Sequence, residues 1–125
     1  MIVPFAPGGI ADITGRPFAV TMSRLLGQPV VVENRAGAAG VIAADHVAKQ
    51  AGDGNTLLMA HINSHAIAPS LQPKLGYVVE RDFTPVTQIA TSPSMLVVHP
   101  SLPVKSVAEL IKLAKARPGA LNYAS

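Results

Sequence analysis

The fold of this chain is decided near its amino terminus by the stretch Ile2-Val3-Pro4-Phe5-Ala6-Pro7-Gly8-Gly9. The first half of this stretch is apolar and predicts a β-strand, the second half has the composition of a tight loop, and a helical pattern carrying Asp12 follows. This order leaves unpaired backbone N–H groups at the positive end of a helix dipole. We therefore expect a site for a carboxylate or phosphate oxygen at the carboxyl end of the strand.

Composition favours a globular protein. The 125 residues are 49% hydrophobic and 14% charged, which is enough for one compact domain with a core. No apolar run approaches the roughly 18 to 20 residues that cross a bilayer, and the amino terminus does not have the pattern of an export signal. The absence of cysteine excludes disulfides and thiolate chemistry. The net charge of +3 includes no dense basic run, which disfavours nucleic acid as a partner.

Apolar β-branched runs alternate with helical patterns along the chain, as in a parallel α/β sheet. The first helix is predicted over residues 10–26, where Gly27 stops it and Pro17 predicts a kink or a later start. Its apolar face is expected to carry Ala11, Gly15, Phe18, Met22 and Leu25. A strand buried on both faces is predicted over residues 30–33.

The remaining predicted elements continue the alternation. A second, alanine-rich helix over residues 41–50 is expected to lie close to the sheet. A last helix begins at Ser106, where Glu109 completes a capping box. Further strands are predicted over residues 56–60, 86–90 and 95–99, and Leu121-Asn122-Tyr123-Ala124 is typical of the start of another. We expect one domain, residues 1–125, that is truncated at its carboxyl-terminal end.

Several collinear motifs resemble the Bug (Bordetella uptake gene) family, the periplasmic solute-binding receptors of tripartite tricarboxylate transporters. The resemblance covers essentially the whole chain. The residues that carry it are Val3 to Gly9 with Asp12, Leu26 to Gly37, Asp53 to Leu58, Arg81 to Val86, Thr91 to Pro93, Leu96 to Pro103 and Leu121 to Ser125.

The resemblance implies an α/β fold, a three-layer domain with a mostly parallel sheet that forms the first lobe of a type II, Venus-flytrap receptor. It implies a small carboxylated solute, which in this family is a dicarboxylate, tricarboxylate, amino acid or aromatic acid. It further implies a periplasmic location, membrane transporter subunits as partners, no cofactor and no enzymatic activity.

The resemblance also assigns residues to the ligand site. Phe5, Ala6, Pro7, Gly8 and Gly9 match the loop whose backbone amides, with ordered water, receive a ligand carboxylate. Asp12 matches an acidic position one turn into the helix. Its carboxylate either recognises an amino or hydroxyl group of the ligand or interacts with the helix dipole and caps the helix.

Two later loops match the other family positions that face the cleft. The first includes His61, Ser64 and His65, and the second includes Ser92 and Pro93. The family more often has a small or hydroxyl residue where His61 stands, so this histidine is expected to change the usual water-mediated contacts and to add a cationic or donor group for an acidic ligand.

Alternatives remain open at this level. His61 and His65 are four residues apart and would share one helix face, but two ligands seldom hold a metal, so no metal site is assigned. A phosphate- or nucleotide-handling enzyme would use the Pro-Gly-Gly loop, yet neither a Walker lysine nor the three-glycine fingerprint is present. A lobe that senses an effector, or a nonfunctional fragment, is the stronger rival. A homodimer through the exposed cleft face would replace a missing lobe.

Overall fold

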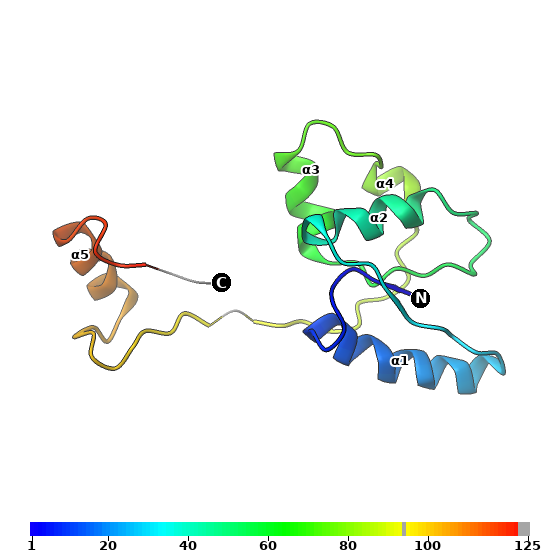
Figure 1. Ribbon diagram of the computed structural model, residues 1–125, viewed down its shortest axis with the longest axis horizontal. Coiled ribbons are helices and arrows are strands. Elements are labelled where there is room, and N and C mark those ends of the chain that lie inside the picture. The colour runs from blue at the N-terminus through cyan, green and yellow to red at the C-terminus, as the bar shows by residue number, and fades with distance from the viewer. Residues whose placement is uncertain (94, 123–125) are drawn as a thin grey trace. The chain divides into compact units, whose positions relative to one another are not determined.

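The computed structural model describes residues 1–93 and 95–122. The chain forms two compact units, Met1–Ala90 and Thr91–Ser125 (Figure 1). That residues 1–125 together form one lobe remains a prediction. Among the described residues, no helix combines the length and apolar character needed to span a bilayer.

A short parallel sheet lies at the centre of the N-terminal unit. Strand β1 (Ile2–Val3) pairs with β2 (Glu33–Asn34), with Ile2 opposite Glu33 and Val3 opposite Asn34. On the other edge of β1, Leu58 forms a parallel bridge with Ile2. The amide of Ile2 donates to the carbonyl oxygen of Leu57 at 2.7 Å, and the amide of Met59 donates to that of Ile2 at 2.9 Å. The predicted parallel pairing is therefore present, with β1 in the middle.

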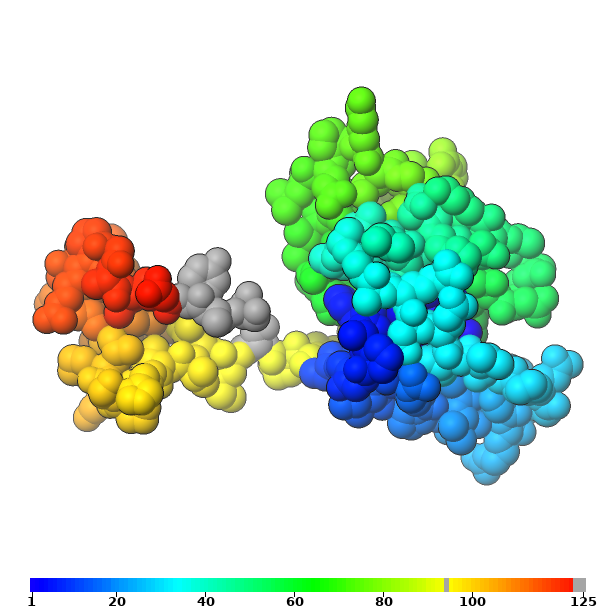
Figure 2. All heavy atoms as spheres, viewed as in Figure 1, coloured from blue at the N-terminus to red at the C-terminus, as the bar shows by residue number. Residues whose placement is uncertain are grey.

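Two helices cover opposite faces of β1. A Cβ built on Gly15 of α1 (Ile10–Leu26) would lie 3.5 Å from Val3 Cγ2, and one built on Gly40, which precedes α2 (Val41–Ala48), would lie 3.2 Å from Pro4 Cβ. Because successive side chains of an extended segment point to opposite sides, α1 and α2 sandwich β1 (Figure 1). In the space-filling view the segment before α2 lies beside the N-terminal segment (Figure 2). The predicted three-layer α/β arrangement is confirmed.

Helix α1 begins and ends at the predicted residues. Gly27 follows it with φ 65°, a left-handed conformation that a glycine adopts without strain, and Pro17 lies within the helix without delaying its start. The predicted apolar face is correct for Ala11 and Gly15, which are buried, but wrong for Leu25, which is 74% exposed. The helix continues beyond the two-residue strands, so its last turn has no sheet beneath it.

The prediction of a doubly buried strand over residues 30–33 is only partly correct. Regular pairing begins at Glu33, and Val31 is 72% exposed. The reason is that β1 begins at Ile2, so among the described residues no strand of that sheet lies beside residues 30–32. The amino group of Met1 lies 2.6 Å from the carbonyl oxygen of Val31, and the amide of Val30 donates to Ser23 Oγ at 2.7 Å.

Helical turns complete the N-terminal unit. A 3-10 turn, η1 (Ala38–Gly40), precedes α2, and a π-helical turn, η2 (Asn63–Ile67), runs into α3 (Ala68–Leu71). Helix α4 (Val79–Asp82) follows. Ala43 and Ala44 of α2 are completely buried, so the alanine-rich helix packs closely, as expected from its composition.

The second unit contains α5 (Val107–Ala116), which the capping box predicted. The amide of Glu109 donates to Ser106 Oγ at 3.2 Å, while the Glu109 carboxylate accepts from the amide of Lys105 at 2.6 Å. The two interactions supply acceptors for N–H groups at the helix start.

The predicted strands over residues 86–90 and 95–99 are wrong, because the described residues there form no ladder. Val86 is 81% exposed and Val97 is 74% exposed. An apolar, β-branched run forms a strand only when a neighbouring strand supplies hydrogen-bond partners. The prediction at residues 121–124 is also wrong for Leu121 and Asn122, and its last two residues lie outside the described part of the chain.

Candidate ligand-binding site

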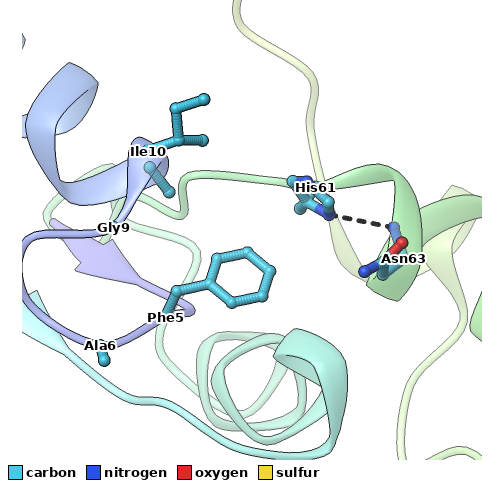
Figure 3. Close-up of a pocket in the computed structure, with 7 residues that line it drawn as sticks. Phe5, Ala6, Gly9, Ile10, His61 and Asn63 are labelled. Atoms are coloured by element: carbon cyan, nitrogen blue, oxygen red, sulfur yellow. Dashed lines mark hydrogen bonds between the residues drawn. The ribbon is translucent and has the colours of Figure 1, made fainter. Parts of the chain in front are cut away.

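A pocket of about 440 Å³ opens at the carboxyl end of β1 (Figure 3). Its walls come from the β1–α1 loop, the first turn of α1 and the segment after Met59. The residues that line it are Phe5, Ala6, Gly9, Ile10, Ala11, His61 and Asn63. The structure thus brings together four of the predicted site residues, Phe5, Ala6, Gly9 and His61, from two loops distant in sequence.

Three backbone N–H groups belong to residues that line this pocket, those of Gly9, Ile10 and Ala11. Ile10 and Ala11 are the first two residues of α1, so their N–H groups have no acceptor within the helix. The amide of Gly9 donates to the Ala6 carbonyl oxygen at 3.3 Å, a long hydrogen bond. These groups lie at the positive end of the dipole of a 17-residue helix. The arrangement is therefore suited to an anionic oxygen.

The amide of Gly8 already has a hydrogen-bond acceptor within the protein. It donates to Asp12 Oδ2 at 2.9 Å, and Gly8 adopts φ 81°, a conformation that favours glycine. Neither Gly8 nor Pro7 lines the pocket. These two residues shape the loop, and direct ligand contact by either stays a prediction.

Asp12 is 4% exposed and is the centre of a polar cluster. Its Oδ2 also accepts from Arg16 Nε at 2.9 Å, and its Oδ1 accepts from Asn34 Nδ2 at 2.9 Å. The bond from Arg16, followed by those from Gly8 and Asn34, holds the pKa of Asp12 well below its usual range. The arrangement favours capping and loop positioning for this carboxylate over contact with a ligand, which stays a prediction.

Asn34 is a functional candidate that sequence reasoning missed. Its Nδ2 also donates to the Phe5 carbonyl oxygen at 3.0 Å, and its Oδ1 accepts from Arg16 at 2.8 Å. The available signal was its position at the carboxyl end of a parallel strand, where α/β folds place ligand sites. Ile10 and Ala11 were also missed, although each lies beside a predicted site residue, whereas Asn63 lies within the loop from His61 to His65 that was expected to face the cleft.

His61 lines the pocket opposite Phe5. The two ring centroids are 4.9 Å apart and the ring planes meet at 80°, an edge-to-face contact (Figure 3). His61 Nδ1 accepts from the amide of Asn63 at 3.2 Å. Since Nδ1 is an acceptor, the neutral ring carries its proton on Nε2, which makes His61 a hydrogen-bond donor at the wall of the pocket.

Ser64 and His65 lie outside the pocket lining. Ser64 is 1% exposed, and its Oγ contacts His65 Nδ1 at 2.9 Å. The His65 ring packs edge-on against Phe83 with a centroid separation of 4.8 Å, and burial lowers the pKa of His65. The hydroxyl of Tyr77 donates to the Ser64 carbonyl oxygen at 2.6 Å. This cluster supports the loop that carries His61, and ligand contact by Ser64 or His65 stays a prediction.

Two further expectations concern residues beyond this cluster. Ser92 and Pro93 belong to the second unit and are not among the residues that line the pocket, so their role also stays a prediction. His61 and His65 point into different surroundings despite their helical spacing. Within residues 1–93 and 95–122, no three His, Asp or Glu side chains form a cluster that would hold a metal ion.

A parallel α/β lobe with an anion-suited loop at the end of its central strand has its pocket where open α/β folds bind ligands, and solved periplasmic binding proteins share this fold. The chain belongs to the tripartite tricarboxylate transporter receptor family, whose model matches residues 14–125. The expected family is thereby confirmed. The members of this family are receptors and not enzymes, which argues against a phosphate- or nucleotide-handling enzyme.

Individual relatives agree with this assignment. The chain is 47% identical to Protein BugT of Bordetella pertussis over 125 residues, which are 99% of this chain and 38% of the relative. It is 43% identical to Rpa4515 of R. palustris, solved with adipate, with a TM-score of 0.82 over 96% of this chain and 40% of that one. For MatC (Rpa3494) from Rhodopseudomonas palustris, solved with malate, identity is 39% and the TM-score is 0.79 over 92% and 40%.

Nearly all of this chain matches its relatives, but it matches only part of each relative. The chain spans about 38% of the length of the curated relatives that it matches. The likeness to the solved structures confirms the fold class of the lobe, and adipate and malate are both carboxylates.

Proposed function

We propose that this chain is the first ligand-binding lobe of an extracytoplasmic receptor of a tripartite tricarboxylate transporter. It binds one carboxylate of a small organic acid at the start of α1. The observation that carries the proposal is the pair of N–H groups of Ile10 and Ala11, which have no intrahelical acceptor and belong to residues that line the pocket. The carboxylates bound to two relatives are consistent with it.

The binding mechanism follows from the loop. A carboxylate that leaves water needs several donors to offset its desolvation, and donors that are already in position cost less entropy on binding. The amides of Gly9, Ile10 and Ala11 supply such donors, with ordered water between them and the ligand where direct reach is too long. The helix dipole adds a favourable field.

We assign the open side of this pocket to a second lobe, in a receptor of the relatives' length. Closure of that lobe would bury the ligand and raise its affinity, and the closed form would be the one that transporter subunits of the membrane recognise. Ser92 and Pro93 would face the same cleft. The periplasm is the compartment in which such a receptor operates.

A negative charge introduced at Gly9 tests the carboxylate site. Gly9 has φ −73°, a conformation open to any residue, and aspartate is a preferred helix N-cap. An added Cβ would lie 3.3 Å from the Ala6 carbonyl oxygen, a close contact that a shift of a few tenths of an ångström relieves, so Gly9→Asp is expected to fold. Its carboxylate competes with the ligand for the first-turn N–H groups. A thermal-shift screen against mono-, di- and tricarboxylates and acidic amino acids is expected to show stabilisation of the wild type and none of the variant.

The matched control is Gly52→Asp. It makes the same change of charge at an exposed position where an added Cβ meets nothing within 4 Å. This variant should keep the wild-type response. Loss of the response in both variants, or in neither, would contradict a site at the first turn of α1.

A homodimer that forms across the cleft face is the alternative to a second lobe as the partner that closes the pocket. A second copy would replace the second lobe and exclude water from the bound carboxylate. Sedimentation velocity over a wide concentration range distinguishes the two, because a chain that stays monomeric throughout does not use this cover.

A further inference from the structure

The walls of the pocket determine which acids fit it, on the basis of the carboxylate site proposed above. We infer that the lobe selects carboxylic acids with an aliphatic or aromatic body next to the bound carboxylate. It discriminates against acids that carry an ammonium group or a second carboxylate on the adjacent carbons. Two observations support this selectivity. The side chains that line the pocket are mostly apolar, and the carboxylate of Asp12 is already hydrogen-bonded within the protein.

No charged side chain lines the pocket, whose residues are two aromatic or imidazole rings, one isoleucine, two alanines, one glycine and one asparagine. An α-ammonium group bound beside the carboxylate would therefore need a counter-charge from elsewhere. It would also lie against the positive end of α1, where cations are disfavoured. Amino acids are unfavourable ligands on both grounds.

Asp12 carries the carboxylate in the first turn of α1, and it is not available for this task. Three donors occupy its oxygens, namely the Gly8 amide, Arg16 Nε and Asn34 Nδ2, each at 2.9 Å. The side chain is 5% exposed, and Arg16 already balances its charge. Recruiting Asp12 to a ligand ammonium would break charge-assisted hydrogen bonds that the protein makes without the ligand.

Beyond the N–H groups, the wall is apolar. Phe5 and Ile10 flank the opening in Figure 3, and Ile10 is 66% exposed without a ligand. A methylene chain or an aromatic ring that covers these side chains removes apolar surface from water. A second carboxylate on a neighbouring carbon, as in citrate, would instead be placed against this wall and lose hydration without compensation.

The polar side chains across the pocket are an imidazole and a carboxamide. His61 offers Nε2–H, because its Nδ1 is occupied by the Asn63 amide, and Asn63 offers its side-chain amide. They suit a hydroxyl or a remote carboxylate at the far end of the ligand. Adipate and benzoate fit this description, whereas L-aspartate and citrate do not.

The test is an NMR titration of the 125-residue chain with adipate, benzoate, L-aspartate and citrate, read at the amides of Gly9, Ile10 and Ala11. Adipate and benzoate are expected to bind about tenfold more tightly than the other two. Equal or tighter binding of L-aspartate or citrate at the same amides overturns the selectivity and leaves the proposed site intact. If no acid shifts these amides, the proposed site itself is wrong.

A matched pair of variants isolates the apolar wall. Ile10→Ala removes wall surface at an exposed helical position, and Ile13→Ala removes the same side chain from a position that is 63% exposed and does not line the pocket. Both changes favour helix formation. The first is expected to reduce the preference for benzoate over acetate several-fold and the second to leave it unchanged. An unchanged preference in both variants overturns the role of the wall.

Discussion

Asn34 and Asp12 join the second strand to the first turn of α1 through a hydrogen bond of 2.9 Å between Nδ2 and Oδ1. The same Nδ2 donates to the carbonyl oxygen of Phe5 at 3.0 Å, before the loop, and the carboxylate of Asp12 receives the amide of Gly8, within the loop. The β1–α1 loop is thus held at two points. The conformation of the loop therefore depends on Asn34, which lies 22 positions after Asp12 in the sequence.

Replacing Asn34 by alanine should weaken ligand binding. The change leaves the Phe5 carbonyl oxygen and one oxygen of Asp12 without this donor, so the loop loses one of its two attachments. We expect the dissociation constant for adipate to rise about tenfold, the order that one charge-assisted hydrogen bond corresponds to. Isothermal titration calorimetry measures the change. Asn34→Asp should be more damaging, because two carboxylates would then face each other.

The control for this change is Asn55→Ala, which removes an exposed side chain hydrogen-bonded to Asp53 in a turn. Adipate affinity is expected to stay at the wild-type value in this variant. An unchanged affinity in Asn34→Ala would show that the loop holds its shape without the asparagine.

Acid should destabilise the N-terminal unit through Asp12. Its pKa is lower in the folded chain than the ordinary value of 3.8, so its contribution to stability is complete above that pH and declines as the pH falls below it. Asp82, whose pKa Arg81 and the Val78 amide lower to about 2, acts in the same direction. The melting temperature followed by circular dichroism should fall between pH 4 and pH 2.

Asp12→Asn should have a lower melting temperature at pH 7 and a shallower decline below pH 4. The control Glu80→Gln removes an exposed carboxyl group of α4 and should keep the steep decline. A decline of equal slope in wild type and Asp12→Asn would mean that other carboxylates dominate acid unfolding.

His65 should produce a second pH dependence near neutrality. Burial lowers the pKa of its imidazole below 6.5, so the folded state favours the neutral ring. Its contribution to stability is present above pH 6.5 and is lost as the pH falls toward the lower folded value. Urea unfolding between pH 7 and pH 5 should show this loss in the wild type, and His65→Phe should remove it. His46→Gln on α2 should retain it, and a wild-type curve that is flat over this range would refute the assignment.

Gly40 should not tolerate a side chain. It adopts φ 92°, and an added Cβ would lie 3.2 Å from Pro4 Cβ and 3.6 Å from Ser64. Gly40→Ala is expected to lower the free energy of unfolding by more than the roughly 1 to 2 kcal/mol that a left-handed backbone costs a non-glycine residue. Urea denaturation measures the change.

Gly54→Ala separates the two contributions, because Gly54 has φ 82° and an added Cβ there meets nothing within 4 Å. This variant should show only the backbone cost. Equal losses of stability at Gly40 and Gly54 would mean that the segment before α2 moves away from Pro4 without cost.

Local signals predicted the parts of the site that are close in sequence. The Pro-Gly-Gly loop, the start of α1 at Ile10 and its end at Gly27 follow from composition, periodicity and the conformational freedom of glycine. The pairing of Asn34 with Phe5 and Asp12 was not predictable in this way, because it depends on the register of β1 against β2. The two-residue strands also explain why apolar residues such as Val31 and Leu25, expected in the core, are exposed.

The histidines illustrate the same division. The sequence determined that His61 and His65 lie four residues apart, and the spacing alone would place them on one helix face. Only the tertiary structure decided that His61 packs against Phe5 in the pocket while His65 packs against Phe83. Sequence by itself determined helices α1, α2 and α5, the glycine-rich loop and the resemblance to the receptor family, since these depend on neighbours along the chain. Tertiary structure decided which segments hold the loop in place, because Asn34 reaches Phe5 and Asp12 only when β2 pairs with β1.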